Sequence, residues 1–378
     1  MKYLLQCCGT ATIVGINARA FLINGDTVCE LKQEEAPSVV STGVTGDPQH
    51  DKGGDPMDIQ CVAISKDADD TLWCAVSRCN KSLEIYRESI FQTLHATAKR
   101  SSCLTFAWQH NSIGGMVICG DLVGDATAFP LQGDRKGRLL LGHTASMLTG
   151  VRLVGGTTLL TADRDEKVRV SSFPQTCIIK GFLLGHSAFV SSVDAVNDDV
   201  CVTCGGDFTV RLWNLSTFSQ LAQVDTNGEL PIQASTNGER VAVIFHNSNT
   251  IRIYSMIALE LLQTLESATQ PLAVVLHYDN MVTLSKEPAL VQAYKLSEGS
   301  IYKAITNDGF SKLNQQCSDE IIPASILEVD SSTGHLKLGK TQETRTADPA
   351  DIPWNRVDRI QKARESRNRR NKKRKVES

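Results

Sequence analysis

Short apolar runs that alternate with polar turns recur along the chain at a regular interval. LLLGH at 139–143 returns as FLLGH at 182–186, so that two Gly-His pairs stand 43 residues apart. Each pair is followed by an apolar run, a turn and a second run that ends in an acidic bend. Runs of this kind predict β-strands, and a repeat of this length is typical of one blade of a β-propeller.

Weaker copies of the unit extend over most of the chain. They predict six blades, near residues 59–95, 101–138, 143–181, 186–225, 229–265 and 271–305. The runs YLLQCC, TATIVGI and AFLIN near the N-terminus supply a seventh blade, and ILEV and HLKLG, between 326 and 339, are expected to help to close the ring. Closure removes sheet edges that would otherwise invite aggregation. The expected fold is an all-β propeller of seven blades over residues 1–340.

Polar residues at fixed places in two blades add a second signature. TADRDEKVRVS (161–171) aligns with TCGGDFTVRLW (203–213). In WD repeats a His, a Thr, an Asp in the bend and a Trp form a hydrogen-bond relay, which satisfies polar groups buried between blades. The fifth blade holds the full set of four: His186, Thr203, Asp207 and Trp213. The fourth blade holds His143, Thr161 and Asp165, with Ser171 in the place of the Trp.

Two segments fall outside the repeat. Residues 33–58 are rich in Gly, Pro, Ser and Asp and are expected to be a flexible insertion between blades. Residues 341–378 begin polar and end as a basic tail, expected to be disordered or helical on binding. From Arg356 to Ser378 there are 11 basic and three acidic residues, whereas the rest of the chain has 28 basic and 39 acidic residues. An acidic body argues against a broad RNA-binding surface on the propeller itself.

The sequence shows no motif for catalysis or for metal binding. It contains no Gly-rich phosphate loop, no nucleophile elbow and no metal-ligand spacing among its eight histidines. The N-terminal apolar run is too interrupted for a signal peptide, so the twelve cysteines are expected to be free thiols in a reducing compartment. A binding platform without cofactor or metal is therefore the favoured function, and an enzyme with a site in the propeller channel is the alternative.

The fourth blade resembles one particular family of WD-repeat proteins. LLLGHTASMLTGVRL (139–153) followed by LLTADRDEKVRVS (159–171) closely resembles the non-catalytic WD-repeat subunit of the tRNA (guanine-N7-)-methyltransferase. FLLGHSAFVSSV (182–193) and CGDLVGDATAF (119–129) resemble the adjacent blades of that family. The close match covers about a third of the chain.

This resemblance implies a partner protein. In the family a separate subunit binds S-adenosylmethionine and forms N7-methylguanosine in the variable loop of tRNA, at position 46. This chain would then be the scaffold of a heterodimer, would bind tRNA mainly through its partner, and would need no cofactor of its own. The alternative is a generic nuclear WD-repeat adaptor, for example in ribosome assembly or in a ubiquitin ligase.

The bend in the fourth blade is the candidate interface. Six of the seven residues from Asp163 to Arg169 carry charge, whereas the matching bend of the fifth blade carries little. Together with the resemblance, this predicts that the partner contacts four side chains: Arg164, Glu166, Lys167 and Arg169. The alternative is a solvated turn around a blade-packing Asp165.

The basic tail is the candidate targeting signal. Its core, KKRK, consists of Lys372, Lys373, Arg374 and Lys375, and it predicts import into the nucleus. A further possibility is that the tail also contacts tRNA phosphates, which would make binding steeply dependent on salt.

Overall fold

The computed structural model describes most of the chain up to residue 338. The described residues are 4–32, 57–108, 114–133, 136–144, 146–195, 197–285, 290–297, 301–318, 327–329 and 336–338. All of them belong to one compact unit, Met1–His50 together with Gly54–Gly339. The predicted insertion, apart from its last two residues, and the predicted tail lie outside the described residues.

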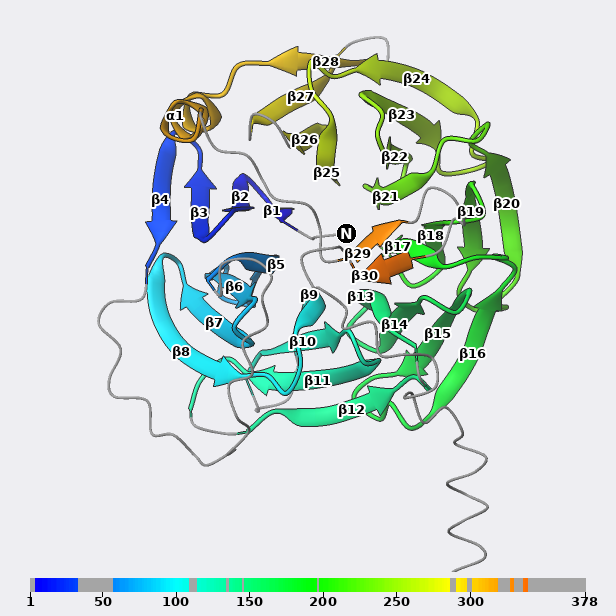
Figure 1. The fold of residues 1–378 in the computed structure, drawn as a ribbon, viewed down its shortest axis with the longest axis horizontal. Helices are drawn as coiled ribbons and strands as arrows, with labels where there is room; N and C mark the ends of the chain where they lie inside the picture. Colours follow the sequence, from blue (N-terminus) through cyan, green and yellow to red (C-terminus); the bar gives the residue numbers. More distant parts are fainter. Residues whose placement is uncertain are drawn as a thin grey trace, which may run out of the picture. The chain divides into compact units, whose positions relative to one another are not determined.

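Seven antiparallel sheets of four strands each form the ring, as predicted (Figure 1). Blade 1 consists of β1 (Leu5–Cys8), β2 (Ala11–Ile16), β3 (Arg19–Asn24) and β4 (Thr27–Leu31). Blade 2 consists of β5 (Ile59–Lys66), β6 (Leu72–Arg78), β7 (Ser82–Arg87) and β8 (Ile90–Ala96). Blade 3 consists of β9 (Ser101–Ala107), β10 (Met116–Asp121), β11 (Asp125–Pro130) and β12 (Arg138–Gly142).

The remaining four blades follow in the same order along the chain. Blade 4 consists of β13 (Leu148–Val154), β14 (Thr158–Asp163), β15 (Lys167–Ser172) and β16 (Ile179–Leu184). Blade 5 consists of β17 (Val190–Ala195), β18 (Val200–Gly205), β19 (Thr209–Asn214) and β20 (Gln220–Asp225). Blade 6 consists of β21 (Pro231–Thr236), β22 (Arg240–Phe245), β23 (Thr250–Ser255) and β24 (Leu261–Glu266). Blade 7 consists of β25 (Pro271–His277), β26 (Asn280–Ser285), β27 (Val291–Ser297) and β28 (Ile301–Ile305).

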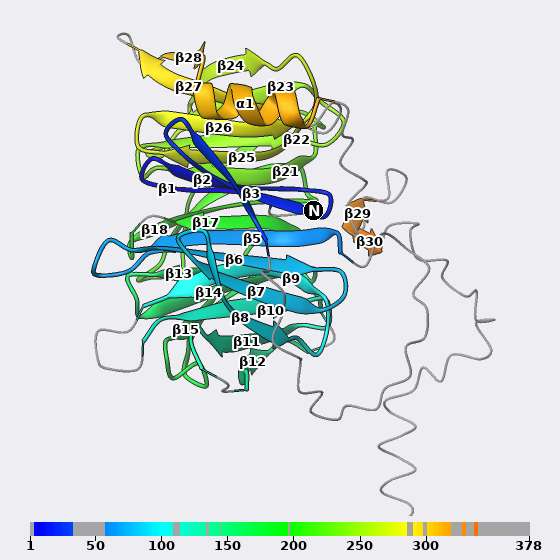
Figure 2. The ribbon, with the colours of Figure 1, turned by 90° about the vertical axis from the view of Figure 1, so that its left-hand side faces the viewer.

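Burial changes from the centre of each blade to its edge. The two middle strands are mainly buried, as in β14, where all six residues are buried, because both faces of each sheet pack against neighbouring blades. The outer strands alternate between exposed and partly buried residues, as in β20 and β24. The first strand of each blade lies at the central axis, and the fourth lies at the rim (Figures 1 and 2).

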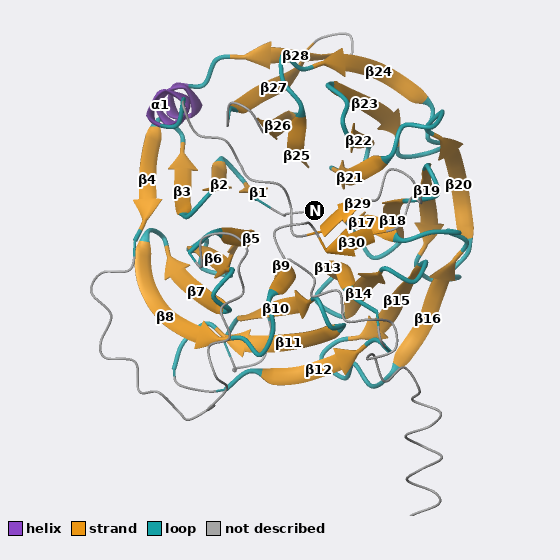
Figure 3. Ribbon diagram, viewed as in Figure 1, coloured by secondary structure: helices purple, strands orange, loops and turns teal. Residues whose placement is uncertain are grey.

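A helix, rather than a strand from the C-terminal region, joins the last blade to the first. Helix α1 (Asp308–Gln316) is the one helix of the described part of the chain (Figure 3). The side chain of Asn307 caps it by accepting a hydrogen bond from Phe310 N at 3.0 Å. Phe310 and Leu313 are buried in a core shared with blades 1 and 7. The side chain of Asn314 bonds both N and O of Val291 in β27, at 2.8 and 2.9 Å.

The expected role of the 326–339 segment in ring closure is therefore wrong. The two short strands there, β29 (Leu327–Val329) and β30 (Leu336–Leu338), pair with each other and with no blade. On the other side of α1, Lys312 Nζ donates to Asp26 O of blade 1 at 2.9 Å. Gly309 approaches the carbonyl of Gly25 so closely that an added Cβ would lie 2.5 Å from it. The helix thus holds blade 1 against blade 7.

Among the described residues, no helix is long and apolar enough to cross a membrane.

Candidate protein-interaction site on the fourth blade

The charged bend of blade 4 is a tight turn held from inside by a single carboxylate. Asp163, the last residue of β14, is 1% exposed at its side chain. Its Oδ1 accepts hydrogen bonds from the backbone N–H groups of Asp165 at 2.9 Å and Lys167 at 3.3 Å. Glu166 adopts a left-handed conformation, with φ of 74°. The bend therefore has a fixed backbone that does not depend on the side chains at its tip.

Asp163, not Asp165, is the blade-packing carboxylate of blade 4, which corrects the sequence prediction. His143 Nδ1 lies 2.8 Å from Asp163 Oδ2, and His143 Nε2 lies 2.8 Å from Thr161 Oγ1. The side chain of Asp165 is 44% exposed and pairs with Arg164 at 3.5 Å. Asp165 is therefore one of the surface charges of the bend.

Blade 5 contains the complete relay at the predicted residues. His186 Nδ1 lies 2.9 Å from Asp207 Oδ1, and His186 Nε2 lies 2.7 Å from Thr203 Oγ1, which also accepts a hydrogen bond from Trp213 Nε1 at 2.7 Å. Burial alone would raise the pKa of Asp207. Hydrogen bonds from His186 and Thr209 outweigh burial and lower this pKa to about 2.

Strand register explains why the two blades use different carboxylates. Thr161 pairs with Arg169 and Thr203 pairs with Arg211, so Asp163 occupies the position of Gly205 at the end of the second strand. A Cβ added to Gly205 would lie 3.1 Å from His186 Nδ1. A side chain at this position is therefore directed at the histidine, and in blade 4 the carboxylate of Asp163 reaches His143 from there.

Three of the four predicted partner-binding residues lie at the surface of the bend. The side chain of Arg164 is 40% exposed, Glu166 is exposed and Lys167 is half-buried. Arg169 differs, because its Nε donates to Ser171 Oγ at 2.9 Å and its Nη2 donates to Thr176 O at 2.8 Å. Burial also lowers the pKa of Arg169. Arg169 is therefore occupied within the blade and supports the bend.

Blade 2 contains a buried relay that the sequence analysis missed. Arg78 forms a two-pronged ion pair with Glu84, at 2.6 and 2.9 Å, and Tyr86 OH donates to Glu84 at 2.9 Å. Strand register places these three residues at the positions of Asp163, Arg169 and Ser171 in blade 4. Arg78 Nη1 also donates to the carbonyls of Ala18 and Met57. The sequence does contain a signal for this pair, because Arg78 and Glu84 are opposite charges within two strongly apolar strand patterns.

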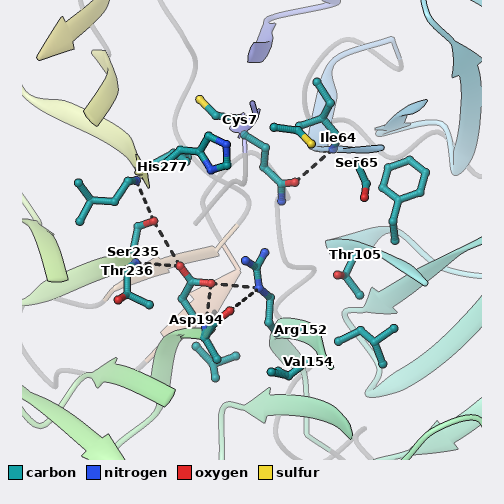
Figure 4. Close-up of a pocket in the computed structure, with 18 of the residues that line it drawn as sticks. Cys7, Ile64, Ser65, Thr105, Arg152, Val154, Asp194, Ser235, Thr236 and His277 are labelled. Carbon is teal, nitrogen blue, oxygen red and sulfur yellow. Dashed lines mark hydrogen bonds and ion pairs between the residues drawn. The ribbon is translucent and has the colours of Figure 1, made fainter. Parts of the chain in front are cut away.

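The propeller channel holds a cavity of about 550 Å³. Figure 4 shows Arg152 and Asp194 paired side by side at its wall, and their Nε and Oδ1 atoms are 3.1 Å apart. Asp194 also accepts hydrogen bonds from Ser235 Oγ and from Thr236 N of the next blade. His277 Nε2 accepts a hydrogen bond from Gly9 N of blade 1 at 2.6 Å. The pKa of His277 is lowered, mainly by burial and then by the nearby positive charge of Arg152.

These channel side chains connect neighbouring blades, which is a structural role. Among the described residues, no group of three or more His, Cys, Asp or Glu side chains is arranged to hold a metal ion. All twelve cysteines are free, and eight of them are buried. The bend of blade 4 remains the best candidate for an interaction site.

Comparison with known proteins finds one family that part of this propeller resembles. Residues 133–312 match the family model of the tRNA methyltransferase TRM82 WD40 domain. The chain is 33% identical over 177 residues to the tRNA (guanine-N(7)-)-methyltransferase non-catalytic subunit wuho of Culex quinquefasciatus, which covers 45% of this chain and 42% of the relative. It is 29% identical over 236 residues to the non-catalytic subunit WDR4 of Mus musculus, which covers 59% and 56%. The chain thus spans about half the length of the curated relatives that it matches.

Solved structures support the fold. A chain of the mitotic checkpoint complex superposes with a TM-score of 0.61 at 17% identity, covering 79% of this chain and 90% of that chain. The WD40 repeats of RRP9 superpose with a TM-score of 0.54 at 16% identity, covering 65% and 79%. The solved structures thus support the propeller fold, and over residues 133–312 the chain is similar to the tRNA methyltransferase TRM82 WD40 domain.

Proposed function

We propose that this protein is the non-catalytic scaffold subunit of a tRNA (guanine-N7-)-methyltransferase. Its curated relatives are named as non-catalytic subunits of that enzyme. In this proposal a separate catalytic subunit binds S-adenosylmethionine and methylates guanine N7 in tRNA. Guanine N7 is already nucleophilic, so the reaction depends mainly on positioning, and a scaffold contributes by holding the catalytic subunit in place.

The observation that carries the proposal is the bend of blade 4. Asp163 fixes its backbone from inside, and Arg164, Asp165, Glu166 and Lys167 are left at the surface with no large role in the fold. Exposed pairs of this kind contribute about 0.2–1 kcal/mol to stability, whereas close charge pairs at interfaces have couplings of about 1.5–7 kcal/mol. The bend is therefore suited to recognising a partner with complementary charges.

Charge reversal at the bend tests this proposal. Lys167→Glu and Glu166→Lys should each raise the Kd for the catalytic subunit by about tenfold or more, because like charges meet at the interface. The melting temperature should change little, since both side chains lie at the surface of the bend and surface substitutions usually move stability by less than about 0.5 kcal/mol. Titration calorimetry gives the Kd, and a thermal scan gives the melting temperature.

Lys81→Glu is the matched control. Lys81 is exposed and occupies the position of Glu166 in the turn of blade 2, with φ of 67°. Its reversal should leave the Kd unchanged. Methylation of tRNA by this chain alone would overturn the scaffold proposal in favour of an enzyme, and failure of the native chain to bind the catalytic subunit would favour a generic adaptor.

The nuclear location is also part of the proposal. Lys372, Lys373, Arg374 and Lys375 lie outside the described residues, and their support for nuclear import is the sequence pattern alone. Contact between this tail and tRNA stays a prediction on the same basis.

A further inference from the structure

Exposed apolar side chains gather on the outer strand of blade 4. Within seven residues this segment holds Ile178, Ile179, Phe182 and Leu184, which are 55%, 45%, 38% and 67% exposed. Strand β16 itself holds three of them, because Ile178 precedes it; the outer strands β8, β12 and β20 each hold one large exposed apolar residue, and β24 and β28 each hold two. Single exposed apolar residues are normal, but a group of four marks an interaction surface.

Strand β16 is an edge strand with a single charged side chain. It is the last strand of its sheet, so one of its backbone edges is unpaired within the blade. Natural edge strands are commonly guarded by charged side chains, lysine above all. The one charged residue of β16 is Lys180, and its Nζ is turned back onto Thr158 Oγ1 at 2.8 Å. Lys180 is itself exposed, so this edge carries one charge beside three exposed apolar side chains, Ile179, Phe182 and Leu184.

Register joins this apolar strip to the charged bend. Lys167 pairs with Leu184, and Arg169 pairs with Phe182. Phe182 and Leu184 are two residues apart on one strand, so their side chains lie on the same face. On the opposite face, a Cβ added to Gly181 would lie 2.5 Å from Phe218 of blade 5, so that side is already packed. The bend and the face bearing Phe182 and Leu184 therefore form one continuous surface.

We propose that this strip, Ile178–Leu184, is the apolar centre of the surface that binds the catalytic subunit, with the bend 164–167 as its charged rim. The inference rests on the proposed function and deepens it. Charged rims mainly set the association rate and the orientation, whereas most of the binding energy comes from apolar side chains that are fully desolvated near the centre of an interface. The partner surface should then present an apolar patch beside charges that complement the bend.

Leu184→Ser is the decisive substitution. The side chain is largely exposed in the free chain, so its loss should leave the melting temperature unchanged. If it is buried in the complex, the Kd for the catalytic subunit should rise about tenfold, the size of effect expected of a central apolar contact. Leu221→Ser is the matched control, because Leu221 is 52% exposed on β20 of the next blade. Its Kd should stay within about twofold of the native value.

The outcomes separate this inference from the proposed function. If Lys167→Glu weakens binding but Leu184→Ser binds as the native chain does, the partner contacts the bend and not the strip, and the inference fails alone. If the native chain does not bind the catalytic subunit, both fail. A second copy of this chain could cover the strip instead, and light scattering on the isolated chain tests this. If the native chain is a dimer and Leu184→Ser is a monomer, the strip serves self-association and the inference is overturned.

Discussion

The fourth and fifth blades share a repeat and a turn, but they place the carboxylate of the relay at different residues. In blade 5 the carboxylate is Asp207, inside the turn, where it also accepts hydrogen bonds from Thr209 and Arg211. In blade 4 it is Asp163, at the end of the preceding strand. In blade 4 the carboxylate that bonds the histidine lies two residues nearer the N-terminus, so no side chain inside the turn is needed for the relay. Position 165 can then carry a surface charge without loss to the fold.

The two turns also differ in whether the side chain at the tip packs against the protein or faces the solvent. Glu166 and Phe208 occupy the same position and are both left-handed, with φ of 74° and 59°. Phe208 packs against a small apolar cluster of Met147, Phe189 and Leu230, whereas Glu166 is exposed. Blade 5 therefore uses its turn for packing, and blade 4 presents its turn to the surroundings.

Removal of the two carboxylates should produce the largest effects on stability. Asp207→Ala leaves His186, Thr209 and Arg211 without their acceptor, and we expect a loss of about 3 kcal/mol in the free energy of unfolding. Asp163→Ala leaves His143 and the turn amides unsatisfied, and should cost about 2 kcal/mol. Urea unfolding measures both. A harmless Asp163→Ala would mean that the relay of blade 4 is dispensable.

Acid should weaken blade 5 through Asp207. Its pKa falls from an ordinary value of 3.8 to about 2 on folding, so its contribution is present above pH 3.8 and is lost as pH falls toward 2. The gap between these pKa values corresponds to about 2 kcal/mol. The difference in unfolding free energy between the native chain and Asp207→Asn should therefore be constant above pH 5 and shrink between pH 4 and pH 2. A constant difference down to pH 2 would contradict the lowered pKa.

Local patterns in the sequence predicted most of the fold. Strand alternation and the repeat located all seven blades, because each blade is built from four consecutive strands. Ring closure was mispredicted, since it depends on the short helix α1 and its C-cap. Their apolar residues Phe310, Leu313 and Cys317 are buried only because they pack against distant blades. A pattern in a single segment does not show which distant surfaces it will join.

The candidate site was predicted in part, and the errors have a physical cause. Alignment by residue type paired Asp165 with Asp207, because it could not show which of two carboxylates, two residues apart in a hairpin, points at the histidine. Arg78 and Glu84 were missed because charged residues in strands are mostly exposed, whereas here each satisfies the other and both are buried. The bend was selected as a candidate because its charges exceed what the fold requires, and its role as an interface stays a prediction.

The smallest effect should come from the tip of the bend, where two glycine substitutions compare the blades directly. Glycine adopts left-handed conformations without strain, so Glu166→Gly and Phe208→Gly should remove the same backbone strain. Both should also raise the conformational entropy of the unfolded chain by the same amount. The difference between them then reports what each side chain does. Glu166→Gly should change the free energy of unfolding by no more than about 0.5 kcal/mol, whereas Phe208→Gly should lower it by about 1–2 kcal/mol through lost apolar contact. Urea unfolding of both variants decides. Equal losses would mean that Glu166 is used inside the fold, and the charged bend would no longer be free for a partner.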